Sequence, residues 1–339
     1  MKRIGILILS IILVVATFTS CNSSSPPGEG QIVNVYSARH YDSDRDLFRR
    51  FEEQTGIIVN VLEGSSQELL ARVNQEKTNP QADLFIDVGV TTLYEFIQSD
   101  LLQNHNLEVS SHLDEGMAGE KWLALTNRAR AIVFDHQVTD NLSISSYLDL
   151  ANPEFYNEIL VRSSTNIYNI ALVAALIQSY GEESAREFSE GVVRNMAREP
   201  QGNDRDQAIA MVAGEGRYTI MSTYYIQMLK VSSDTQQAYV GPRLSVAFPD
   251  ETFVDISWMG VIQRATNSDN AVKLMEFLLT TEAQNDFMML NGELPVNNNS
   301  PIAEELSILY DFNRLLIDYE LLGRYMGRAI MIMNEAGWR

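Results

Sequence analysis

Short apolar segments alternate with amphipathic segments in the region that follows the N-terminal 30 residues. Strands are predicted over residues 32–36, 57–62 and 83–88, and helices over 42–54, 65–73 and 91–99. The second helix has a capping-box start, because Ser65 precedes Glu68 by three positions. Gly56 follows the first helix and is the usual kind of residue to end one. This β-α-β-α order predicts an α/β fold with a mostly parallel sheet covered by helices on both faces.

The same alternation continues to the end of the chain. Strands are predicted over residues 129–134, 159–161, 218–221 and 254–262, and helices over 168–180, 183–196, 204–212, 270–279 and 282–290, with a helical tail from Ile302 onward. The segments 121–134 and 254–262 are extended, apolar and free of proline. We expect the chain to cross between two lobes at these two segments, so that the lobes can close on a ligand by a hinge motion.

Composition narrows the class of protein. The 339 residues, 45% of them apolar, are enough for two domains with real cores. A formal net charge of −20 and the lack of a basic face exclude nucleic acid as a partner. The sequence has no GxSxG, GxGxxG, P-loop or HExxH motif, and its only cysteine lies near the N-terminus, so we do not expect an enzyme.

Residues 1–20 have the features of a secretory signal peptide. Two basic residues precede an apolar run at 4–15, and small residues then lead to Cys21. Cleavage before Cys21 would leave it free to carry a lipid, and residues 21–30 would form the lipidated cysteine and a flexible tether. We therefore expect export, with a lipid anchor at the periplasmic or extracytoplasmic face of the membrane. A signal peptide without lipidation is the alternative.

Five side chains that can bind a metal stand in three short segments, as His40 with Tyr41, Tyr168, and Tyr224 with Tyr225. Phenolate oxygen is a hard, anionic ligand, and hard ligands suit hard cations such as Fe(III). Four phenolates and one imidazole would make a credible ferric site if the fold brought them together. Taken alone, the Tyr224–Tyr225 pair is better explained as a pair that is half core and half surface; the flanking sequence blocks reverse that interpretation.

The predicted elements suggest how these residues could meet. The pair at 224–225 follows Ser222 and Thr223, which are N-cap types, and side chains that open a helix stand about 100° apart, so both phenols could face one cleft. His40 and Tyr41 follow the first strand, at the carboxyl end where α/β sheets bind ligands. Tyr168 opens a helix after the polar turn 163–166, which could instead cradle an oxyanion.

Several blocks of the sequence resemble the ferric iron-binding proteins of ABC importers, particularly the tyrosine-rich cyanobacterial-type branch. The blocks are SARHYDSDRDLFRRFEEQTGI, KWLALTNRARAIVFD, LVRSSTNIYNIALVAAL, AREPQGND and STYYIQML, and GRYMGRAIMIMNEAGW shows a weaker similarity. The resemblance implies a two-lobed periplasmic-binding-protein fold of the two-crossing type (type II). It also implies ferric iron in the cleft between the lobes, held by four tyrosinates and one histidine.

Carried over motif by motif, the resemblance implies the metal ligands His40, Tyr41, Tyr168, Tyr224 and Tyr225. A complex of Fe(III) with four phenolates and a neutral imidazole carries a formal charge of −1. Arg39, Arg128, Arg130 or Arg162 could offset that charge from behind the ligands, and the first three are the preferred candidates. Many family members carry an arginine three residues after the tyrosine pair, where this chain has Met228.

The lobes are expected to comprise residues 31–127 plus 257–298 and residues 128–256 plus 299–339. Fe³⁺ would be the transported ligand, without an organic cofactor, and a synergistic anion is conceivable but not favoured. The expected partners are an ABC transporter permease and its ATPase, and the membrane through the lipid anchor; the protein itself is expected to be a monomer. Two alternatives stay open: a binder of an oxyanion or polycationic solute on the same fold, and an envelope iron-handling protein without a transporter.

Overall fold

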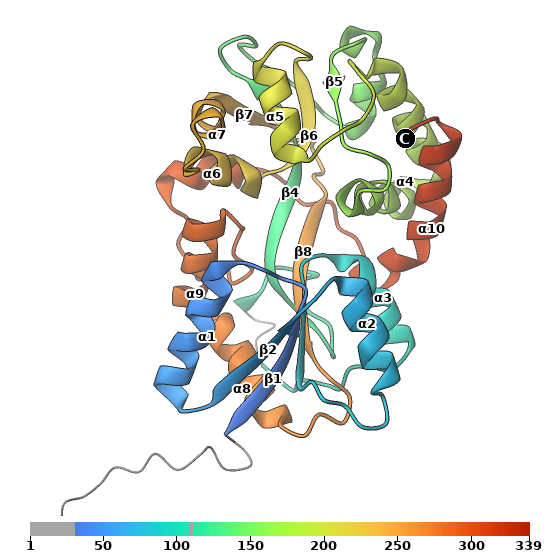
Figure 1. Ribbon diagram of the computed structural model, residues 1–339. Coiled ribbons are helices and arrows are strands. Elements are labelled where there is room, and N and C mark those ends of the chain that lie inside the picture. The colour runs from blue at the N-terminus through green and yellow to red at the C-terminus, as the bar shows by residue number, and fades with distance from the viewer. Residues whose placement is uncertain (1–30, 109–111) are drawn as a thin grey trace, which may run out of the picture.

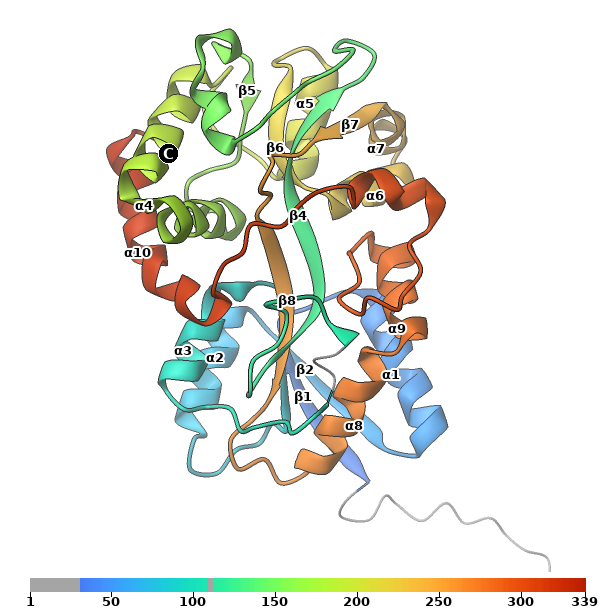
Figure 2. The ribbon, with the colours of Figure 1, turned by 180° about the vertical axis from the view of Figure 1, so that it is seen from behind.

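A computed structural model describes residues 31–108 and 112–339. The chain forms two halves, one above the other in Figure 1, that are joined at a waist. Two long neighbouring strands, β4 (Leu123–Asp135) and β8 (Val254–Val261), run through the waist from one half to the other (Figure 2). They coincide with the two segments predicted to cross. The predicted signal peptide, Cys21 and the tether lie outside the described residues.

Each half is built from strands with helices packed around them. The lower half contains β1 (Ile32–Ser37), α1 (Asp42–Thr55), β2 (Ile58–Glu63), α2 (Ser66–Gln75), β3 (Leu84–Asp87), α3 (Leu93–Gln98), α8 (Ser268–Leu278) and α9 (Thr281–Asp286). The upper half contains β5 (Ile159–Leu160), α4 (Ile167–Asn195), α5 (Asp204–Val212), β6 (Tyr218–Ser222), α6 (Tyr224–Lys230), α7 (Thr235–Val240) and β7 (Leu244–Ala247).

The strands form one sheet in the order β2-β1-β3-β8-β4-β6-β5, with β7 paired to β4. Strand β1 is parallel to β2 and β3, and β5 is parallel to β6, but every pairing of β4 and β8 is antiparallel. The prediction of a mostly parallel sheet is therefore wrong, and the sheet is mixed. The double crossing is the cause, because β4 leaves the lower half for the upper half and β8 returns in the opposite direction.

Most predicted helices are confirmed, together with the residues that bound them. Helix α1 ends at Gly56, whose φ of 72° is the left-handed conformation that glycine adopts without strain. Ser65 and Glu68 form the predicted capping box of α2. The two helices predicted over 168–180 and 183–196 both lie within α4, which is kinked between them at Gly181, where the backbone is not helical. Helix α7 and strand β7 were not predicted, because both are short and carry little periodicity.

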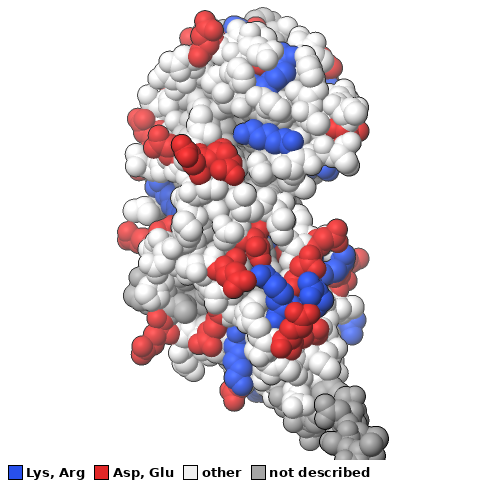
Figure 3. Space-filling model, turned by 90° about the vertical axis from the view of Figure 1, so that its left-hand side faces the viewer, with Lys and Arg blue, Asp and Glu red and all other residues white. Residues whose placement is uncertain are grey.

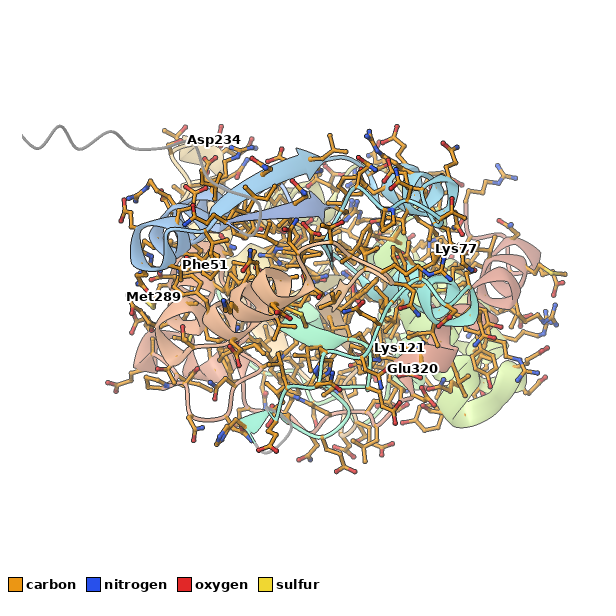
Figure 4. All side chains as sticks on the ribbon, turned by 90° about the horizontal axis from the view of Figure 1, so that it is seen from below. Phe51, Lys77, Lys121, Asp234, Met289 and Glu320 are labelled. Carbon is orange, nitrogen blue, oxygen red and sulfur yellow. The ribbon has the colours of Figure 1, made fainter. Side chains whose placement is uncertain are left out.

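The tail departs from the predicted continuous helix after Ile302. It makes a short 3-10 turn at Glu304–Leu309, runs extended with a bridge between Arg314 and Thr252, and only then forms α10 (Tyr319–Glu335). Helix α10 packs on α4 of the upper half and on α3 of the lower half. At its start Glu320 accepts a hydrogen bond from the Trp122 indole at 2.8 Å; Glu320 and Lys121, the residue before Trp122, are both labelled in Figure 4.

Charges of both signs are mixed on the surface. Figure 3 shows acidic and basic side chains gathered together on the lower half of the face where α1 lies. Residues of α1 form ion pairs such as Arg49 with Glu53 at 2.8 Å and Arg45 with Glu63 at 2.9 Å. Such exposed pairs add little stability. Within residues 31–108 and 112–339, no helix is both long and apolar enough to cross a membrane.

Candidate metal-binding site

The segments that carry the predicted tyrosine ligands all follow strands that end at the waist. Strand β1 precedes Tyr41, β5 precedes the turn that leads to Tyr168, and β6 precedes Tyr224 and Tyr225. The two crossing strands set these directions. Strand β6 is antiparallel to β4, which rises into the upper half, so β6 descends to the waist. Strand β3 is antiparallel to β8, which descends into the lower half, so β3 and its parallel neighbour β1 rise to the waist. Loops at the carboxyl ends of strands are where α/β sheets place their ligands.

Tyr224 and Tyr225 begin α6, as predicted from the N-cap types before them. Thr223 occupies the N-cap position but makes no capping hydrogen bond with its side chain. The two rings lie close, with centroids 4.1 Å apart and an interplanar angle of 31°. Tyr224 is buried and Tyr225 is partly buried. Both rings of the pair are therefore presented together from the first turn of one helix.

Tyr168 meets this pair from α4. Its backbone N–H donates to the Asn166 side chain at 3.2 Å, which caps the helix at its start. The Tyr168 and Tyr224 hydroxyl oxygens are 3.4 Å apart. Two phenol oxygens at this distance can share one cation if both lose their protons.

Tyr41 completes the cluster from the lower half. It occupies the N-cap position of α1 with extended backbone geometry, and the Arg39 guanidinium lies 4.8 Å from the centre of its ring. Its phenol interacts electrostatically with those of Tyr168, Tyr224 and Tyr225. The fold thus brings together all four tyrosines that the sequence singled out.

Burial disfavours the phenolate forms of Tyr41, Tyr168 and Tyr224. Desolvation raises the pKa of Tyr41 to about 12, with a further rise from Glu293 and opposing effects from Arg39 and Arg128. Burial also raises the pKa of Tyr168 and of Tyr224, and the neighbouring phenols add to the effect. A cation that binds here must therefore displace protons.

His40 is not brought into the cluster. Its side chain is 54% exposed, and Nδ1 lies 3.4 Å from Oε2 of Glu63. Within the described residues, His, Cys, Asp and Glu form no group of three that could hold a metal. The tyrosines are thus the donors that the described part of the chain assembles.

Replacing His40 by Ala is expected to change the affinity for Fe(III) by less than about tenfold, because the exposed imidazole is held by Glu63 rather than by the tyrosines. Competition with citrate would measure this effect. A loss comparable with that caused by removing a tyrosine would show that His40 turns inward and ligates.

Arginine guanidinium groups lie over the rings of the clustered tyrosines. The Arg128 guanidinium is 5.6 Å from the ring centre of Tyr168 and 5.8 Å from that of Tyr224. Arg130 and Arg162 each lie 5.8 Å from the Tyr168 ring centre. Guanidinium groups at this range favour the phenolate over the phenol. The arginines proposed from the sequence therefore surround the cluster, although Arg130 is also tied to Asn169 and Ser222.

Glu293 is a central group that the sequence analysis missed. Its carboxylate is fully buried and binds Arg39 at 2.8 Å and Arg128 at 3.2 Å. Burial acts to raise the pKa of Glu293, but the two arginines and Asn291 lower it to about 2, so the group stays ionised. Glu293 is 254 positions from Arg39 in the sequence and belongs to no motif. No sequence signal could have predicted its contact with the arginines that lie over the tyrosine rings.

The polar turn before α4 has little capacity left for an oxyanion. The Ser164 N–H donates to the backbone oxygen of Arg339 at 3.1 Å, and the Thr165 N–H donates to Ser163 Oγ at 3.2 Å. The Asn166 N–H donates to the backbone oxygen of Ser163. An anion bound at this turn would have to displace these contacts.

A cavity of about 500 Å³ opens between the halves beside the start of α4. It is mostly apolar and is lined by side chains such as Val88 of the lower half, Ile167 and Ile170 of α4, and Met326 of α10. None of the four clustered tyrosines lines it. The two halves therefore leave open space between them that the clustered tyrosines do not border.

Comparisons with known proteins agree with this architecture. Iron uptake protein A1 of Synechocystis sp. is 36% identical over 325 residues, which cover 92% of this chain and 89% of that protein. The solved structure of a ferric binding protein from Campylobacter jejuni superimposes with a TM-score of 0.82 at 34% identity, covering 91% of this chain and 100% of that one.

A Trichodesmium protein described as IdiA or FutA, in complex with iron and citrate ligands, gives a TM-score of 0.83 at 34% identity, again covering 91% of this chain and 100% of that one. The resemblance to ferric iron-binding proteins and the two-lobed periplasmic-binding-protein fold are thereby confirmed. The sequence model of the family described as bacterial extracellular solute-binding proteins matches residues 79–319 of this chain. The chain therefore belongs to the family of bacterial extracellular solute-binding proteins.

Proposed function

We propose that this protein binds ferric iron outside the cytoplasm through Tyr41, Tyr168, Tyr224 and Tyr225 and delivers it to an ABC transporter permease. The observation that carries the proposal is the convergence of four phenols from three distant segments at the waist. Phenolates are hard, anionic donors and select a hard trivalent cation over softer or less charged ions. Iron is the solute here, and no organic cofactor is required.

Charge balance supports Fe³⁺ over a divalent cation. Four phenolates and Fe³⁺ carry a formal charge of −1, whereas Fe²⁺ in the same site would carry −2. Arg39 and Arg128 stand close to the rings, but three buried carboxylates, Asp44, Asp255 and Glu293, already pair with them. The site therefore has little spare positive charge with which to stabilise a divalent complex, and reduction of the iron would favour its release.

The same placement gives iron a mechanical role. If residues 31–127 plus 257–298 form one lobe and 128–256 plus 299–339 form the other, Tyr41 belongs to the first lobe and the other three tyrosines to the second. Iron bound to both sets would then hold the lobes together, with β4 and β8 as the hinge. The closed form would be the one that a permease recognises.

As a member of an extracellular solute-binding family, the protein works outside the cytoplasm. We propose that a lipid on Cys21 anchors it to the membrane as a monomer and that a permease with its ATPase completes the importer. Relatives described as iron uptake and ferric iron-binding proteins support this assignment. A synergistic anion is not favoured, because the turn at 163–166 is internally hydrogen-bonded.

A thermal-shift experiment tests the proposal independently of iron redox chemistry. Metal-stripped protein beginning at Ser23 is mixed with gallium(III) citrate, and separately with Fe(II) under anaerobic conditions. A ligand that binds only the folded state stabilises it by about 2.7 kcal/mol at 100 times its dissociation constant, so gallium should raise Tm by several degrees and Fe(II) should not.

The matched pair of variants is Tyr224→Phe, which should lose the gallium shift, and Tyr156→Phe, which should keep it because Tyr156 is 67% exposed whereas Tyr224 is buried. Equal shifts with gallium and Fe(II), or an undiminished shift in Tyr224→Phe, would count against a trivalent tyrosinate site.

A further inference from the structure

The loop Asn291–Glu293, at the end of the π-helical segment Phe287–Asn291, lies against the segment that carries Tyr41 and against α6, which carries Tyr224 and Tyr225. Glu293 accepts two hydrogen bonds from Arg39, from Nη1 to Oε1 and from Nη2 to Oε2, both at 2.8 Å. It also accepts one from Arg128 Nη1 at 3.2 Å. One carboxylate therefore joins the arginine behind Tyr41 to the arginine behind Tyr168 and Tyr224.

The two arginines pair with different second carboxylates, Arg39 with Asp44 and Arg128 with Asp255. Arg39 also pairs with Asp44 on α1, at 2.8 Å and 3.0 Å, which holds it to the lower half. Arg128 stands on the crossing strand β4 and donates to Ser257 on β8 at 3.0 Å. Arg39 Nη1 also donates to Ser257 Oγ, at 2.8 Å, so both arginines share this hydroxyl as well. Glu293 is the charged group common to both, and it couples the position of the β1–α1 loop to that of the crossing strands.

The loop also abuts the tyrosine pair. Gly292 has a φ of 72°, and a Cβ there would lie 2.6 Å from Gln227 Cβ and 2.9 Å from the backbone oxygen of Tyr224. Only a glycine allows the loop to lie this close to α6. On its other side the Asn291 side chain donates to Glu293 at 3.0 Å and accepts from Ser43 Oγ of α1 at 3.0 Å.

We propose that Glu293 is the positioning residue of the tyrosine site. By holding Arg39 and Arg128 at the ring faces, it fixes the relative placement of Tyr41 and of the tyrosines from the upper half. It also keeps both guanidiniums from swinging onto the phenolate oxygens that the iron needs. This inference rests on the proposed function and adds a residue that does not itself touch the metal. Removing a buried carboxylate leaves its cationic partners uncompensated and free to move.

The experiment compares Glu293→Gln with Asp44→Asn in the otherwise intact protein, using ferric citrate as the probe. Both variants remove one buried carboxylate bound to Arg39, but only Glu293 also holds Arg128. The measured quantities are Fe(III) affinity, the position of the phenolate-to-iron charge-transfer band in the fully loaded protein, and the reduction potential of the bound iron. Groups that orient metal ligands typically contribute 10- to 100-fold to affinity.

Glu293→Gln is expected to weaken Fe(III) binding by about 10- to 100-fold and to move both the band and the potential. Asp44→Asn should weaken binding by less than about tenfold and leave the band in place. A merely structural role for Glu293 would lower Tm without moving the band of the loaded site. Unchanged affinity, band and potential in Glu293→Gln, or equal effects of the two variants, would overturn the proposal.

If Glu293→Gln does not fold, Thr126→Val provides a milder variant. It keeps the side-chain shape and removes the hydrogen bond that Thr126 Oγ1 donates to Glu293 Oε1, at 2.8 Å, together with the longer one that it accepts from Arg39 Nη1, at 3.4 Å. A smaller band shift supports the proposal, and no shift overturns it. Failure of the proposed function looks different, because the wild-type protein itself would then show no charge-transfer band.

Discussion

Tyr224→Phe is expected to lower the affinity for Fe(III) by about 100-fold or more, equivalent to about 2.8 kcal/mol. The variant keeps the buried ring and removes only the oxygen, which lies 3.4 Å from the Tyr168 hydroxyl. Substituting a group that only orients a metal ligand typically lowers metal affinity 10- to 100-fold, so the loss of a direct ligand should lower it at least as much. Competition with citrate over a range of citrate concentrations would measure the difference.

The control for this prediction is Tyr156→Phe, which makes the same chemical change at an exposed position. It should bind iron like the wild-type protein. Melting temperatures of both metal-free variants would establish that neither change unfolds the chain. If Tyr224→Phe retained wild-type affinity while folded, Tyr224 would not be a ligand.

Iron binding is expected to weaken steeply as the pH falls. The pKa values of Tyr41, Tyr168 and Tyr224 are raised, that of Tyr41 to about 12, so these phenols are protonated in the metal-free protein at neutral pH. They must be phenolates in the complex. Protons therefore favour the metal-free state, and affinity rises with pH throughout the range below these pKa values. At least about three protons should leave per Fe(III) bound, which corresponds to about 1,000-fold in affinity per pH unit.

Base consumption at constant pH would count the released protons when iron is added as ferric citrate, after subtraction of a blank without protein. The count should fall by about one in Tyr224→Phe. A release of less than one proton per iron in the wild-type protein would mean that the phenols stay protonated and that iron is held by other groups.

The elements of this fold were predictable because their periodicity is local. Capping residues such as Ser65 and stop residues such as Gly56 act within a few positions, and both were found where expected. The sheet directions were not predictable in the same way. They depend on two crossing strands, β4 and β8, that run in opposite directions through both halves.

The site shows the same division between local and distant information. The start of α6 at Tyr224 followed from the N-cap types before it. His40 and Tyr41 are adjacent in sequence, but neighbouring side chains in an extended segment point to opposite sides, so the structure turns Tyr41 inward and His40 outward. Glu293 is far from Arg39 in the sequence and meets it only in the folded chain, and no sequence pattern predicts this contact.

A visible absorption titration tests the central claim most directly. Metal-stripped protein beginning at Ser23 is titrated with ferric citrate at neutral pH, alongside single Phe variants of Tyr41, Tyr168, Tyr224 and Tyr225. A phenolate-to-iron charge-transfer band that saturates at one iron per chain, and that weakens in each of the four variants, is the predicted result. A folded wild-type protein that develops no such band, or a band that none of the four substitutions alters, would contradict the tyrosinate site.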